Sequence, residues 1–170
     1  RHEEVVDNGA AMPVEGTGNA IWMIGAGKGW GKDADGMLLE GENPFENGDY
    51  SVEASGNKQK SEMKYVPSLL AGEYAVYVSY KTLSNSTSKA QYTVVHKGQK
   101  TTFSVNQKMG GGTWVYLGTF AFDDDRTQNY VSVASVANGK EVVTTDAVKF
   151  GGGMGSVARY PQPNAVENTP

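Results

Sequence analysis

The stretch GEYAVYVSYKTLSNSTSKAQYTVVHKGQKTTFSVNQ, Gly72 to Gln107, decides the fold class of this 170-residue chain. It holds three runs rich in Val, Thr, Tyr and Phe, the residue types enriched in β-strands. Turn-forming residues separate the runs, at Asn85 to Thr87 and at Lys97-Gly98. Because successive side chains of a strand point to opposite faces, one face of the first run is predicted to enter the core. That face carries Tyr74, Val76, Val78 and Tyr80.

Further strand candidates with the same composition flank this stretch on both sides. They are DYSVEAS and SEMKYVPS before it, and GTWVYLGTFAF, NYVSVASVA and KEVVTTDAVKF after it. No run of amphipathic helical period interrupts them, which disfavours a parallel sheet with crossover helices. The 22 glycines also favour turns and short strands over long helices. The sequence therefore predicts an all-β protein, an antiparallel β-sandwich.

The run from Gly112 to Phe122 is apolar on both faces if its alternation is unbroken. One face would carry Trp114, Tyr116, Phe120 and Phe122, and the other Val115, Leu117 and Ala121. A strand that is apolar on both sides usually lies in the middle of a sheet, so we predict a central strand here. We expect Trp114 to be buried and the glycines before it to form the turn.

The chain ends differ from this regular part. Residues 1–155 are predicted to form one sandwich module, of which residues 9–49 are loop-rich. Residues 156–170 lose the alternation, so we expect a linker or an arm towards a neighbouring domain outside this sequence.

Composition restricts the partners. The net charge of −4 and the pI near 5.2 give no attraction to phosphate backbones, so nucleic acid is not expected. No apolar run approaches the roughly 20 residues that span a bilayer, so membrane insertion is not expected either. There is no cysteine, which excludes disulfides and thiolate metal sites but leaves the compartment open.

Several blocks together resemble the golvesin C-terminal-like module of bacterial proteins named xanthan lyases and of related Bacteroidetes surface proteins. The matching pieces are GEYAVY, YTVVHKG, VNQ, GGTW with Leu117-Gly118, and Asp146-Ala147-Val148. The resemblance implies a jelly-roll-like sandwich similar to carbohydrate-binding modules. It also implies that the module is not catalytic and is attached to a larger exported enzyme, a polysaccharide lyase or an amidase- or peptidase-like hydrolase. An extracytoplasmic location, secreted, periplasmic or at the cell surface, follows from the same resemblance.

The residues themselves offer no assembled catalytic group. There are only two histidines, His2 and His96, and neither an H-E-x-x-H nor a G-x-S-x-G motif occurs. The glycine-rich segment Gly25 to Asp33 lacks the Ser/Thr of a phosphate loop and no helix is predicted after it. Asp33 and Asp35 are calcium candidates in an acidic loop, but Gly36 comes too early for an EF-hand, so a solvated loop is favoured and no cofactor is expected.

Carbohydrate binding is the function that remains, because sugar rings stack their C–H faces on exposed aromatic planes. Trp30, between two glycines in a loop, is the predicted exposed platform. Trp22 and Tyr50 are further candidates, but the apolar neighbours of Trp22 favour its burial in the core, and Tyr50 is ambiguous. The competing hypothesis is a docking module that packs on the catalytic domain of its parent chain and binds no polysaccharide or glycan.

Overall fold

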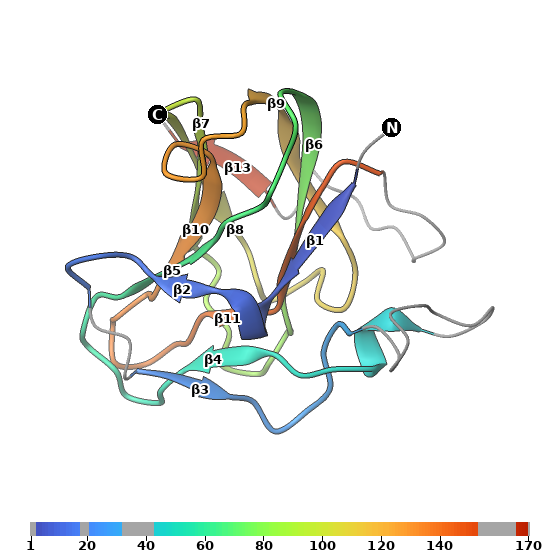
Figure 1. Cartoon of the computed structure of the whole chain (residues 1–170). Coiled ribbons are helices and arrows are strands. Elements are labelled where there is room, and N and C mark those ends of the chain that lie inside the picture. Colours follow the sequence, from blue (N-terminus) through green and yellow to red (C-terminus); the bar gives the residue numbers. More distant parts are fainter. Residues whose placement is uncertain (1–2, 18–20, 32–42, 153–165, 170) are drawn as a thin grey trace.

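A computed structural model describes residues 3–17, 21–31, 43–152 and 166–169 of the chain, and these form three antiparallel sheets (Figure 1). The four-stranded sheet has the order β1-β12-β6-β9. Its strands are β1 (Glu4–Asp7), β12 (Ala147–Phe150), β6 (Gly72–Ser79) and β9 (Val115–Phe122). Every pairing within it is antiparallel.

The six-stranded sheet has the order β13-β8-β7-β10-β5-β2. Its strands are β13 (Val166–Thr169), β8 (Gln99–Val105), β7 (Ala90–His96), β10 (Tyr130–Ala134), β5 (Glu62–Tyr65) and β2 (Met12–Pro13). The small third sheet has the order β11-β4-β3, from β11 (Thr144–Thr145), β4 (Ser51–Glu53) and β3 (Trp22–Ile24). Two short 3-10 helices, η1 (Asn8–Ala10) and η2 (Pro44–Glu46), complete the described elements.

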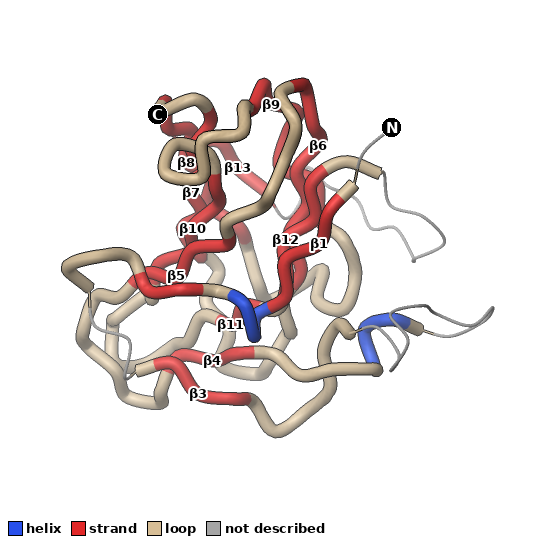
Figure 2. The backbone as a smooth tube through the Cα atoms, viewed as in Figure 1, coloured by secondary structure: helices blue, strands red, loops and turns tan. Residues whose placement is uncertain are grey.

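The two larger sheets stand side by side, and the third sheet lies below them in the view of Figures 1 and 2. Inward-facing side chains of both large sheets form one apolar core, so the predicted all-β antiparallel sandwich is confirmed. The predicted core face of β6 is buried as expected. Its members are Tyr74, Val76, Val78 and the following Tyr80, which pack with Tyr92, Val94, Phe103, Val131 and Val133 of the opposite sheet.

The hairpin between β7 and β8 shows why its sequence folds this way. Lys97 and Gly98 both have positive φ, 52° and 82°, as the two-residue turn of a tight antiparallel hairpin requires. A lysine adopts this conformation less readily than a glycine. The Oδ1 atom of Asn129 compensates by accepting a hydrogen bond from the Lys97 backbone N–H at 2.9 Å.

The prediction for the strand beginning after Gly112 was wrong in two respects. The pairing of β9 with β6 shifts between Val76 and Tyr77, where Leu117 is an extra residue and Gly118 has φ 151°. This β-bulge reverses the alternation, so that Phe120 and Phe122 turn to the core while Tyr116 faces outward. In addition, β9 lies at the edge of its sheet in the described part of the chain and not in its centre. On the outer side, Trp30 and Phe45 of the front segment cover Trp114, the residue before β9, whereas Tyr116, Thr119 and Ala121 of the strand itself are exposed.

The tail contributes a strand. Residues 166–169 pair antiparallel with β8, with Val166 opposite Val105. This segment of the expected linker thus adds to the six-stranded sheet. Whether the tail also leads to another domain stays a prediction.

Candidate functional site

The outer face of the four-stranded sheet carries a second apolar cluster. Alternation turns Val5, Tyr77 and Lys149 to this face while their neighbours enter the core. We call the cluster the outer aromatic cluster; it consists of Trp30, Phe45, Tyr77, Trp114 and Ala147, with Val5 and Ala75 packed against it. The ring centroids of Phe45 and Trp114 are 5.3 Å apart in an edge-to-face arrangement, and those of Trp30 and Trp114 are 6.2 Å apart.

Backbone contacts hold the loop-rich front segment on this face. Gly29 and Gly48 exchange two hydrogen bonds, of 2.8 and 2.9 Å, and form an antiparallel bridge. A Cβ atom at Gly48 would lie 2.1 Å from the Trp30 carbonyl oxygen, so only glycine allows the two segments to come this close. The bridge brings Trp30 and Asp49 together on the sheet.

Asp146, between β11 and β12, fixes Trp30 in this position. Both of its carboxylate oxygens lie within hydrogen-bond distance of the Trp30 backbone N–H, at 3.1 and 2.9 Å. Asp146 is only 2% exposed, and burial raises the pKa of its carboxyl to about 7. The hydrogen bond from Trp30 opposes this rise, whereas the charges of Asp7 and Asp49 add to it.

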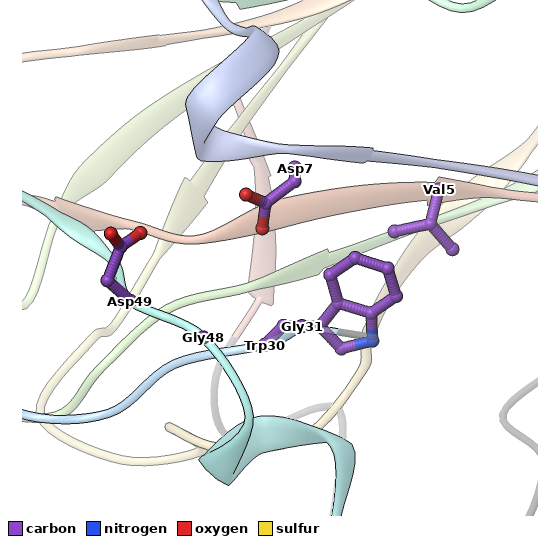
Figure 3. Close-up of a pocket in the computed structure, with 6 residues that line it drawn as sticks. All are labelled: Val5, Asp7, Trp30, Gly31, Gly48 and Asp49. Atoms are coloured by element: carbon purple, nitrogen blue, oxygen red, sulfur yellow. The ribbon is translucent and has the colours of Figure 1, made fainter. Parts of the chain in front are cut away.

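A shallow pocket of about 430 Å³ opens beside Trp30 (Figure 3). Its lining residues are Val5, Asp7, Trp30, Gly31, Gly48 and Asp49. Figure 3 shows the carboxyl groups of Asp7 and Asp49 on one side of this space and the Trp30 indole and Val5 on the other. The pocket therefore combines an apolar wall with two acidic groups.

Asp7 is partly desolvated in the pocket wall. One carboxylate oxygen, Oδ2, accepts a hydrogen bond from the Gly9 N–H at 3.2 Å. The other, Oδ1, is buried without a hydrogen-bond partner in the described part of the chain. Burial raises the pKa of the Asp7 carboxyl, and the charge of Asp49 raises it further against the effect of the Gly9 hydrogen bond.

Two lysines of this region are engaged outside the pocket. Lys149 is buried, with its Nζ 5.6 Å from the centre of the Trp114 ring and 3.8 Å from a carboxylate oxygen of Glu3. Lys81 donates a hydrogen bond from Nζ to the Lys28 carbonyl oxygen at 3.1 Å. Neither is among the residues that line the pocket.

Tyr116 is the exposed aromatic residue of this face. Among the described large hydrophobic residues that are exposed, it is the aromatic one, at 38%. Its ring packs on that of Tyr77, with centroids 5.4 Å apart, and its hydroxyl is hydrogen-bonded to that of Thr119 at 2.7 Å. The ring is thus held in place while much of it faces solvent.

The structure corrects the predicted exposure of Trp30. Its side chain is 8% exposed, because the glycine bridge folds its loop onto Trp114 and Phe45. Tyr50 is buried at 3%. Trp22 is half-buried, packs against the main core and donates from its indole to the Ser61 hydroxyl at 3.0 Å. Of the three residues predicted to bind carbohydrate, only Trp30 lines the pocket.

Trp114 is buried at 3%, as predicted. Sequence reasoning missed Asp7 and Asp49 altogether, and it placed Tyr116 on an uninterrupted apolar face. The glycine inside the β9 run, Gly118, was the one sequence signal of a bulge.

The described residues show no metal centre. Within residues 3–17, 21–31, 43–152 and 166–169, no three His, Cys, Asp or Glu side chains lie as a metal site requires. The calcium candidates Asp33 and Asp35 fall outside the described residues. His96 hydrogen-bonds the Thr101 hydroxyl at 2.9 Å and packs on Phe120, and burial lowers the pKa of its imidazole. This histidine supports the β7–β8 hairpin.

Comparison with known families identifies the family to which this chain belongs. The model of the golvesin C-terminal domain matches residues 40–152, which is more than half of the chain. The chain belongs to the golvesin C-terminal domain family. The resemblance seen in its strand sequences is thereby confirmed.

Two relatives of this golvesin-type domain are xanthan lyases. The xanthan lyase of Bacillus sp. (strain GL1) is 31% identical over 104 residues, which cover 59% of the chain and 11% of that enzyme. The solved structure of Paenibacillus xanthan lyase matches 87% of the chain, with a TM-score of 0.57 and 25% identity. The match covers 13% of the xanthan lyase chain. The golvesin-type domain thus spans only about an eighth of the length of these enzymes.

The golvesin-type domain also contains, within its described part, no helix long and apolar enough to cross a membrane.

Proposed function

We propose that this golvesin-type domain is a non-catalytic accessory module that binds carbohydrate on the outer face of its four-stranded sheet, with Tyr116 as the stacking platform. The parent would be a longer exported enzyme related to xanthan lyases, a polysaccharide lyase or an amidase- or peptidase-like hydrolase. Support for an accessory role comes from the match to a small part of two xanthan lyases. An extracytoplasmic location belongs to the same proposal.

The observation that carries the binding proposal is the fixed, exposed ring of Tyr116. A sugar stacks on an aromatic plane best when the plane does not have to be ordered first, since ordering a side chain costs free energy. The contact with Tyr77 and the hydroxyl bond to Thr119 restrict the Tyr116 ring before any ligand arrives. Exposed Thr119 also offers a hydroxyl beside the ring for a sugar hydroxyl.

The bulge of β9 supports the same assignment. An unbroken strand would have turned Phe120 and Phe122 outward with Tyr116, and the bulge at Leu117 and Gly118 sends both phenylalanines to the core. Bulges that redirect side chains are over-represented beside functional sites. Here the bulge leaves one aromatic ring on the open part of the face.

Affinity electrophoresis and calorimetry against xanthan, plant polysaccharides, host glycans and peptidoglycan fragments test the proposal. Tyr116→Ala is expected to weaken binding by about tenfold or more. A nucleic-acid base stacked on one aromatic ring contributes about 1–3 kcal/mol, and we expect a sugar ring stacked on Tyr116 to contribute a similar amount. Tyr130→Ala is the matched control, since Tyr130 is a half-buried tyrosine of the six-stranded sheet with Lys64 over its ring at 5.1 Å. Equal binding by both variants and the wild type would remove Tyr116 from the site.

Docking onto a catalytic domain of the same parent chain is the second candidate, and β3 is the observation that favours it. Met23 and Ile24 of this edge strand are 56% and 63% exposed. Apolar side chains on an unpaired sheet edge are typical of contact surfaces. Met23→Ser with Ile24→Ser in the full parent enzyme should then loosen the domain, seen as faster proteolytic release, whereas sugar binding by the isolated module should not change.

A further inference from the structure

The pocket beside Trp30 has a chemical character that the proposed stacking on Tyr116 does not require. Its acidic groups, Asp7 and Asp49, face an apolar wall formed by Trp30 and Val5 (Figure 3). We propose that this pocket binds the protonated amine of an amino sugar; this rests on the proposed carbohydrate-binding function and assigns a charge preference to the same face.

The charge balance of the pocket favours a cation. Among the described residues that line it there are two carboxyl groups and no lysine or arginine. Lys149 is engaged with Glu3 and Trp114, and Lys81 with the Lys28 carbonyl. Asp146 adds a third carboxyl behind Trp30.

The acidic groups also oppose one another. The charge of Asp49 raises the pKa of Asp7, and both charges raise the pKa of Asp146. A bound cation would relieve this repulsion, whereas a uronate would increase it. Ligands with a negative charge are therefore disfavoured at this position.

The aromatic wall suits an ammonium group as well. A cation is attracted to the face of an indole, and the attraction grows as the pair is shielded from water. The Trp30 ring packs on Trp114, and the hydrogen bond from the Trp30 backbone N–H to Asp146 holds the loop that carries it. Asp49 is exposed and can meet a ligand directly.

The pocket and Tyr116 lie on the same side of the four-stranded sheet, where Trp30 and Phe45 of the front segment cover the part around Trp114. Val5 and Asp7 lie on β1 and Tyr116 on β9, the two edge strands of the four-stranded sheet, so about 15 Å separates them across the strands. A short oligosaccharide stacked on Tyr116 therefore has the length to reach towards the pocket with a second ring.

Isothermal titration of the 170-residue protein with three tetrasaccharides tests the inference: tetraglucosamine, its fully N-acetylated counterpart, and tetragalacturonate, at pH 6 and two salt concentrations. Tetraglucosamine is expected to bind about three- to tenfold more tightly than the acetylated form, with the advantage reduced by salt. Asp49→Asn should remove this advantage, measured as the ratio of the affinities for the two glucosamine tetramers. Asp124→Asn, at an exposed carboxyl in the turn after β9, is the matched control.

The outcomes separate the two proposals. If the acetylated tetramer binds and the amine gives no advantage, or if the advantage survives Asp49→Asn, the amine pocket is refuted and the stacking platform stands. If tetragalacturonate binds as tightly as tetraglucosamine, the charge preference is refuted. If none of the three binds and the polysaccharide panel is also negative, both proposals are refuted.

Discussion

Replacing Asp146 by asparagine should increase the stability of the domain relative to the wild type, and this gain should be larger at pH 8 than at pH 4. The carboxyl is buried, lies near Asp7 and Asp49, and has its pKa raised from 3.8 to about 7. A group with a raised folded-state pKa favours folding while it is protonated in both states, below about pH 4. That contribution is lost as the pH rises towards 7, because folding then requires either a buried charge or a bound proton.

The size of the effect follows from the rise in the pKa of Asp146. At 1.36 kcal/mol for each pH unit between 3.8 and about 7, the wild type loses at most about 4 kcal/mol between pH 4 and pH 8. Asparagine is neutral throughout this range, and its amide oxygen still accepts the Trp30 N–H. The stability difference between variant and wild type should therefore shift in favour of the variant by up to about 4 kcal/mol across the range.

Urea unfolding followed by tryptophan fluorescence at pH 4, 5, 6, 7 and 8 measures this difference directly. Asp124→Asn serves as the control, because its carboxyl is exposed and its removal should give a nearly constant difference. A difference between Asp146→Asn and wild type that stays constant within about 0.5 kcal/mol over the series would refute the burial argument.

Two further substitutions test how the front segment and the third sheet are held. Trp30→Ala should destabilise the domain by about 3 kcal/mol, since the side chain is buried against Trp114, and a loss below about 1 kcal/mol in urea unfolding would show that its loop is not docked. Glu53→Gln should cost about 2–4 kcal/mol, because the buried carboxylate accepts from the backbone N–H groups of residues 136, 137 and 143 and from the Asn57 amide. Thermal melts measure this loss, with Glu73→Gln, at an exposed position on β6, as the control. Equal melting midpoints for the two variants would contradict the prediction.

The strands were predictable because their residues act locally. Alternating Val, Thr and Tyr with turn residues between the runs were sufficient to predict β6, β7 and β8 and the buried face of β6. The same reasoning failed at β9, where one extra residue at the bulge reversed the alternation. Periodicity alone does not reveal such an insertion.

The candidate site was harder to predict because distant segments build it. The Gly29–Gly48 bridge and the hydrogen bonds of Asp146 help to bring Trp30 together with Asp7 and Asp49. Flanking glycines suggested an exposed tryptophan, yet here they permit close backbone approach and so bury it. Local sequence does not distinguish these two uses of glycine.

The most direct test of carbohydrate binding on the outer face is NMR titration of the ¹⁵N-labelled domain with the best-binding oligosaccharide from the polysaccharide panel. The account predicts the largest chemical-shift changes at Tyr116, Thr119 and Tyr77, with smaller changes at Met23 and Ile24. Changes confined to β3, or none on the four-stranded sheet at saturating ligand, would contradict it.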